Sequence, residues 1–209
     1  SGVGHAVRAA GNLPLLQDKL GIRASMYDRR YQGYTDDVFV GNRDSNTGRE
    51  YGGRVALTWT PSDTLRMNIS GLWNRTQSDD NAVVTLGDVS SYAAGGAEFL
   101  RGQPKFGALA GSHPFAQPFS KKLDYYEATI NYDTPPGVTL TSASSWSRTA
   151  TIRIQDTTAS YGEFPPAFGE SANGYSNYRL DLNLRKFTQE LRATSATGGR
   201  LEWLIGGFY

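Results

Sequence analysis

Apolar and polar residues alternate along most of this chain with a period of two. In the clearest case, Leu65, Met67 and Ile69 alternate with arginine, asparagine and serine. Such alternation is typical of a β-strand with one apolar and one polar face. We therefore predict an all-β protein with no long helix. The eight predicted strands lie near residues 3–13, 19–27, 54–59, 65–74, 126–132, 138–146, 186–196 and 201–209.

The connections between these strands alternate strictly between short and long. Short turns are predicted at 15–18, 61–63, 135–137 and 197–199, and long loops at 32–48, 78–119 and 155–183. In an antiparallel barrel, every second connection lies at the same rim, and outer-membrane barrels have short periplasmic turns and long extracellular loops. The order therefore favours an antiparallel transmembrane β-barrel, or a segment of one.

Aromatic residues near the strand ends fit this interpretation. Trp59 and Tyr132 precede short turns, whereas Trp73, Tyr126 and Trp146 lie toward the long loops. On the fourth predicted strand, Leu65 and Trp73 lie about 27 Å apart along the strand, which corresponds to on the order of 20 Å of height at a tilt of about 40°. We interpret the five residues as two partial membrane girdles. The alternative is that they are core aromatics of a soluble sandwich.

Composition and charge narrow the possible functions. The 209 residues contain 21 basic and 20 acidic side chains, so there is no basic excess for nucleic acid. Cysteine is absent, and two histidines, His5 and His113, are too few for a histidine metal cluster. We find no nucleophile elbow, phosphate-binding loop or zinc motif. We therefore expect no enzyme activity, no cofactor and no metal site.

Several segments resemble the barrel of TonB-dependent outer-membrane receptors. The resemblance rests on the order and spacing of the segments, and it covers most strand residues but almost none of the two longest loops. The segments are NLPLLQDKLGIRASMY at 12–27, GYTDDV at 33–38, GNRDSN at 41–46, YGGRVALTWTPSDTL at 51–65, FTQELRATS at 187–195 and RLEWLIGGFY at 200–209.

This resemblance implies a 22-stranded barrel in the bacterial outer membrane. Residues 1–209 would form one partial barrel domain of about eight strands, with the plug domain and the other strands outside this sequence. The family implies a receptor that binds a scarce nutrient, most often a ferric siderophore, at its extracellular loops and imports it with TonB energy. The implied partners are outer-membrane lipid, the plug domain, the inner-membrane TonB complex and the nutrient itself. A saccharide remains open as the ligand.

Charged residues on the polar strand faces are candidates for the barrel interior. The lumen of a large barrel is wet, whereas a charge facing lipid at mid-membrane costs a few kcal/mol. We expect these side chains to line the lumen or to contact a plug: Arg23, Arg54, Arg66, Glu190 and Arg192.

Aromatic residues in the long loops are candidates for ligand contact, because exposed rings bury area at low entropy cost. They are Phe106, Phe115, Tyr161, Phe164, Phe168, Tyr175 and Tyr178. The alternative is that they pack the loops together. We interpret the pairs Asp36–Asp37 and Asp79–Asp80 as solvated loop residues, and His113 as a solvated or turn residue. The spacing of Asn42, Asp44 and Asn46 resembles a calcium loop, but Gly48 is misplaced for that motif and no suitable distal glutamate follows.

Two other functions remain open. A complete eight-stranded outer-membrane barrel of structural or adhesive role is favoured by the alternation at residues 201–209. A soluble carbohydrate-binding β-sandwich would require the apolar rows to form a buried core. The positions of the first and last strands distinguish a closed eight-stranded barrel from an arc of a larger barrel. In the closed barrel the two strands pair directly, and in the arc they lie on opposite edges of the sheet.

Overall fold

The computed structural model describes residues 2–86, 104–135, 137–158, 175–198 and 200–209. Its strands are β1 (His5–Leu16), β2 (Leu20–Tyr31), β3 (Asp36–Asp37), β4 (Gly48–Ser62), β5 (Leu65–Ser78), β6 (Ala110–Gly111), β7 (Phe119–Asp133), β8 (Thr139–Asp156), β9 (Asn177–Thr194) and β10 (Leu204–Phe208). Among these residues there is no helix of the length and apolar character needed to cross a membrane.

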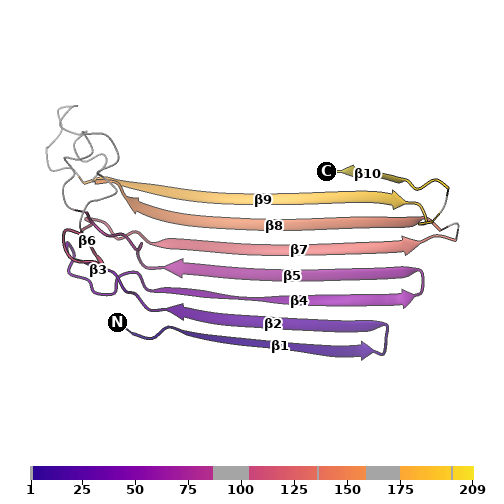
Figure 1. Cartoon of the computed structure of the whole chain (residues 1–209), viewed down its shortest axis with the longest axis horizontal. Helices are drawn as coiled ribbons and strands as arrows, with labels where there is room; N and C mark the ends of the chain where they lie inside the picture. Colours follow the sequence, from indigo (N-terminus) through magenta and orange to yellow (C-terminus); the bar gives the residue numbers. More distant parts are fainter. Residues whose placement is uncertain (1, 87–103, 136, 159–174, 199) are drawn as a thin grey trace.

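The eight long strands form one antiparallel sheet in the order β1-β2-β4-β5-β7-β8-β9-β10 (Figure 1). The predicted number and order of the strands are confirmed. β1 and β10 occupy opposite edges of the sheet and do not pair with each other. The structure is therefore an open arc, and the alternative of a closed eight-stranded barrel does not match this chain.

The connections divide between the two ends of the sheet. The short turns lie at one end, called here the turn end, and the long loops 32–47, 79–118 and 157–176 start from the other, the loop end (Figure 1). At the turn end, Asp18 and Gly137 adopt positive φ angles of 54° and 82°. Asp and Gly are residues that tolerate this left-handed conformation.

Several strands run further toward the loop end than the alternation predicts. β4 begins at Gly48, β7 begins at Phe119, and β8 continues to Asp156. In β4 and β5 both faces carry polar side chains there, so the period of two disappears while the backbone ladder continues, as between Gln77 and Ser120. In β8 the alternation itself continues through Ile152 and Ile154, and in β9 the leucines at 180, 182 and 184 lie on the opposite face from Ile69. The predicted loop at 155–183 is consequently too long, because β9 already begins at Asn177.

The strand register separates the sheet into two faces. Leu57 lies opposite both Ile22 and Ile69, and Ile69 lies opposite Ala128. We call this side the apolar face. The side that carries Arg54, Asn68 and Glu127 is the polar face. Since directly opposed residues of antiparallel strands point to the same side, each row of the ladder belongs to one face.

The apolar face is not covered by any described part of the chain. Met26 is 64% exposed and Leu191 is 58% exposed, and Ala110 is the single buried apolar side chain among the described residues. The second sheet consists of β3 and β6 alone, with two residues in each strand. The buried core that a soluble β-sandwich requires is therefore not formed within the described residues.

Candidate functional site: the two faces and the loop end

The five predicted girdle residues all lie on the apolar face. Tyr126 is opposite Trp146, with ring centroids 5.8 Å apart. Trp73 lies over Gly53, where an added Cβ would meet its Cη2 atom at 2.4 Å. Trp59 and Tyr132 lie nearer the turn end, opposite Met67 and Leu65. The register thus places two groups of amphipathic rings at different heights on one face, as membrane-interface aromatics are placed.

The predicted lumen residues all lie on the polar face. Arg54 donates hydrogen bonds to Ser70 Oγ and to Glu127 Oε1, each at 3.2 Å. Ser70, which is buried, also donates to Glu127 Oε1 at 2.7 Å. Tyr125 donates to the other oxygen of Glu127 at 3.2 Å. Glu127 therefore holds side chains from β4, β5 and β7 together.

The remaining predicted lumen residues lie at other places on the same face. Arg23 donates to Asn12 Oδ1 at 2.8 Å, and Arg192 Nη1 lies 3.5 Å from Glu190 Oε1. Arg66 is opposite Asn131. By register, all five charged side chains lie on the face opposite Leu57 and Ile69. Contact with a plug stays a prediction.

Basic side chains dominate the polar face of the long strands. Nine are basic and four are acidic, whereas the whole sequence is nearly neutral. The basic ones are Arg8, Arg23, Arg29, Arg54, Arg66, Lys121, Arg153, Lys186 and Arg192, and the acidic ones are Glu50, Glu127, Asp133 and Glu190. The polar face therefore favours a partner or ligand with negative charge.

Two neighbouring hollows of about 580 and 530 Å³ share Ser25, Tyr27 and Glu50, which lie on the polar face. Tyr27 and Tyr31 each donate a hydrogen bond to the Glu50 carboxylate, at 3.0 and 3.1 Å, and Asn74 donates at 3.1 Å. Glu50 thus joins donors from β2 and β5 in one network, and the positive charge of Arg29 also acts on its carboxylate.

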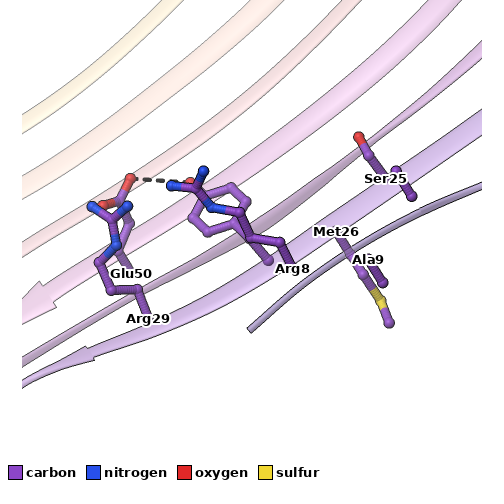
Figure 2. Close-up of a pocket in the computed structure, with 8 residues that line it drawn as sticks. Arg8, Ala9, Ser25, Met26, Arg29 and Glu50 are labelled. Atoms are coloured by element: carbon purple, nitrogen blue, oxygen red, sulfur yellow. Dashed lines mark hydrogen bonds between the residues drawn. The ribbon is translucent and has the colours of Figure 1, made fainter. Parts of the chain in front are cut away.

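Figure 2 shows Arg8, Arg29 and Glu50 on one side of the sheet, with Met26 and Ala9 pointing to the other.

Aromatic residues from all three long loops meet at the loop end. The ring of Tyr175 lies 5.7 Å from that of Phe39 and 6.4 Å from that of Phe115, and both pairs are edge-to-face. We call Phe39, Phe115 and Tyr175 the loop cluster. Phe39 and Tyr175 are exposed and Phe115 is half-buried. The cluster thus combines loop packing with an accessible aromatic surface.

The other predicted ligand-contact residues have different positions. Phe106 has the Lys105 ammonium 5.3 Å from its ring centroid. Tyr178 is a strand residue, opposite Gln155 at the start of β9, so its assignment to a loop is wrong. Tyr161, Phe164 and Phe168 lie outside the described residues.

Phe39 is a site residue that the sequence reasoning missed. It lies in the run Val38-Phe39-Val40, whose side chains are all exposed. An apolar run in the middle of a long polar loop is the signal that marks it, since exposed apolar patches on soluble surfaces often mark contact sites.

Buried carboxylates hold these loops in place. Asp37 Oδ1 accepts the backbone N–H groups of Phe39 at 2.9 Å and His113 at 3.3 Å. Asp80 Oδ1 accepts the N–H of Gln117 at 2.9 Å. Asp37, Asp80 and Gln117 are all buried. The interpretation of Asp37 and Asp80 as solvated residues is therefore wrong, because both carboxylates are buried and accept backbone N–H groups. The His113 side chain is 15% exposed, so it is not fully solvated either.

Within the described ranges, no three histidine, aspartate or glutamate side chains lie close enough to hold a metal ion.

The comparison with protein-family models and with curated proteins finds no match. The fold is similar to the ferric-catecholate import receptor Fiu from E. coli K12. The open form matches with a TM-score of 0.61 and 14% identity, over 92% of this chain and 30% of that chain. The closed form matches with a TM-score of 0.61 and 13% identity, over 92% and 28%. The likeness is one of fold.

This chain spans less than a third of the length of the receptor structures that it matches. The similarity supports a barrel-like relation: an antiparallel eight-stranded sheet that corresponds to part of a receptor barrel.

Proposed function

We propose that residues 1–209 form part of the wall of a larger outer-membrane barrel of the TonB-dependent receptor type. The observation that carries the proposal is the open eight-stranded sheet, with an exposed apolar face and long loops at one end only. Natural proteins avoid leaving sheet edges unpaired. Further strands of the same protein would therefore pair with β1 and β10, giving 22 strands if the family pattern holds.

The two faces of the sheet then have defined environments. The apolar face and its aromatic rows contact lipid, and the polar face lines the lumen. The loop end is extracellular and the turn end is periplasmic, in keeping with the general arrangement of outer-membrane barrels. In this orientation Arg23, Arg54, Arg66, Glu190 and Arg192 contact a plug domain or the passing ligand.

The proposed activity of the whole protein is active import of a scarce nutrient. The loop cluster makes the first contact with the ligand, and the basic polar face below it attracts the ligand inward. An inner-membrane TonB complex supplies the energy through the plug domain, so the described strands provide a binding wall without a catalytic step.

A ferric siderophore is the ligand class that we favour over a neutral saccharide. Many ferric siderophores carry negative charge, which the excess of basic side chains on the polar face would attract. The name of the Fiu receptor states that it imports ferric catecholates. The rings of Phe39 and Tyr175 offer flat surfaces to aryl groups. A saccharide would use the same rings but gain nothing from the positive charge.

The test is ligand binding and uptake by the full-length protein. Purified receptor is titrated with a ferric tris-catecholate complex, a ferric trihydroxamate and a maltooligosaccharide, and uptake of radiolabelled iron is measured in cells. The matched control is Leu109→Ala, an exposed apolar residue of the second loop whose structural hydrogen bond is made by its backbone.

We expect a ferric complex to bind, with at least a fivefold weaker affinity in Phe39→Ala and Tyr175→Ala but not in Leu109→Ala. Binding of the saccharide alone would contradict the siderophore assignment. Binding of none of the three probes, together with iron uptake equal to that of cells lacking the gene, would contradict the proposed function.

A further inference from the structure

Asp37 and His113 join the first and second long loops directly beneath the loop cluster. Asp37 is 2% exposed and the His113 side chain is 15% exposed. Both hydrogen bonds of Asp37 described above use Oδ1. Its Oδ2 has no hydrogen-bond partner among the described residues, and His113 Nδ1 lies 3.8 Å from it. We call this pair the loop junction.

The backbone around the loop junction fixes the imidazole near the carboxylate. β3 and β6 pair in parallel, so that Asp37 lies opposite Gly111. A Cβ on Gly111 would lie 2.4 Å from His113 Cε1 and 2.6 Å from the carbonyl oxygen of Val83. Any larger residue there would displace the ring or the backbone. The 3.8 Å separation is therefore held by the packing of two loops.

The neighbouring acidic groups are already engaged. Asp36 Oδ1 accepts the N–H of Asp44 at 2.9 Å, and Asp80 Oδ1 accepts the N–H groups of Asn81 and Gln117. Asp156 accepts the N–H groups of Phe115 and Thr158. β6 consists of Ala110 and Gly111 and carries no charge. In the described part of the chain, Asp37 is thus the charged group that faces His113.

We propose that protonation of His113 closes the loop junction and thereby orders the loop cluster for ligand capture. A buried carboxylate oxygen without a donor is costly, and a charge-assisted hydrogen bond from an imidazolium would satisfy it. Histidine is the side chain that ordinarily changes charge between pH 5 and 8. At acidic pH the imidazolium moves about 1 Å toward Asp37 Oδ2 to reach hydrogen-bond distance. At alkaline pH the neutral ring offers this oxygen at most an uncharged N–H, which is a weaker partner than the imidazolium.

The closure acts directly on the proposed ligand site. Phe39 is two residues from Asp37 and is tied to it by its N–H, and Phe115 is two residues from His113. A tighter junction therefore restrains two of the three rings of the loop cluster. This consequence for capture rests on the proposed function, whereas the proton-linked junction itself does not.

The experiment measures the junction without any ligand. Hydrogen exchange of the segments 36–42 and 108–116 is followed in the full-length protein at pH 5.5 and 7.5, with rates corrected for the intrinsic pH dependence of exchange. We expect protection about tenfold higher at pH 5.5. His113→Gln should remove this difference. His5→Gln, which changes the only other histidine of the sequence, should keep it.

Protection that does not change with pH in the parent, or that changes equally in His113→Gln, would overturn the proposal. Asp37→Asn provides the second variant: it keeps an oxygen for the N–H groups of Phe39 and His113 but removes the charge, and it should also abolish the pH effect. If the junction responds to pH as expected while Phe39→Ala leaves ligand binding unchanged, the junction stands and the proposed capture role of the loop cluster fails.

Discussion

Replacing Ile69 by arginine tests the assignment of the two faces most simply. Ile69 lies on the apolar face, four residues from both Leu65 and Trp73. This distance is about 14 Å along the strand in each direction, or on the order of 10 Å of height at a tilt of about 40°. Ile69 therefore lies near the middle of the proposed apolar band.

An arginine that faces lipid at the bilayer midplane destabilises an outer-membrane barrel by about 2–4 kcal/mol. Ile69→Arg should consequently shift the folding equilibrium by roughly 30-fold to 1,000-fold. The matched control is Asn68→Arg, one residue away on the polar face, opposite Thr58 and Thr129. In a wet lumen this change should cost less than about 1 kcal/mol, because the charge stays hydrated.

The assay is guanidinium unfolding of the full-length protein in phospholipid vesicles, followed by tryptophan fluorescence. Equal midpoints for the two variants would refute the lipid assignment of the apolar face. A larger loss for Asn68→Arg would reverse the two faces.

Three further predictions concern Gly53, Glu127 and the charge of the polar face. Gly53→Val places a Cβ 2.4 Å from Trp73 and should displace that ring. The displacement should change the quenching of tryptophan fluorescence by brominated lipids. The control Gly207→Val has open space at its Cβ and should leave the quenching unchanged. Glu127→Leu should lower the free energy of unfolding in urea by about 1–3 kcal/mol, because buried Ser70 loses its acceptor. Glu127→Gln should lower it by less than about 1 kcal/mol, because the partly exposed ion pair with Arg54 contributes little. Binding of an anionic ferric complex should weaken as salt rises from 50 to 500 mM, since screening reduces the attraction of the basic polar face; an affinity that does not depend on salt would argue for a neutral ligand.

The strands were predictable because two uniform environments act on alternate residues. Met67 and Ile69 are apolar, Asn68 and Ser70 are polar, and this contrast persists wherever one face is apolar. The same alternation predicts which face of the sheet the side chains of Arg54 and Glu190 occupy. The loop-side ends of β4 and β5 were not predictable, because both faces of the sheet are polar there and the side-chain pattern no longer shows which way each residue points.

The loop end was predictable only in part. Tyr175 and Phe115 stand out as aromatic residues in long polar loops, but Phe39, which contacts Tyr175, belongs to a loop whose position depends on the pairing of β3 with β6. These strands have two residues each, too few for a pattern. The burial of Asp37 likewise depends on donors from a loop more than 70 residues away in the sequence. Such contacts arise from tertiary packing, which a local pattern does not encode.

The central claim is that this chain is an arc in the wall of a larger barrel. An experimental structure of the full-length protein in a lipid nanodisc tests it most directly. We predict that β1 and β10 remain apart, that each pairs with a further strand of the same protein, and that Met26, Ile69 and Leu191 face lipid. Direct pairing of β1 with β10, or burial of these three side chains beneath a second sheet, would contradict the account.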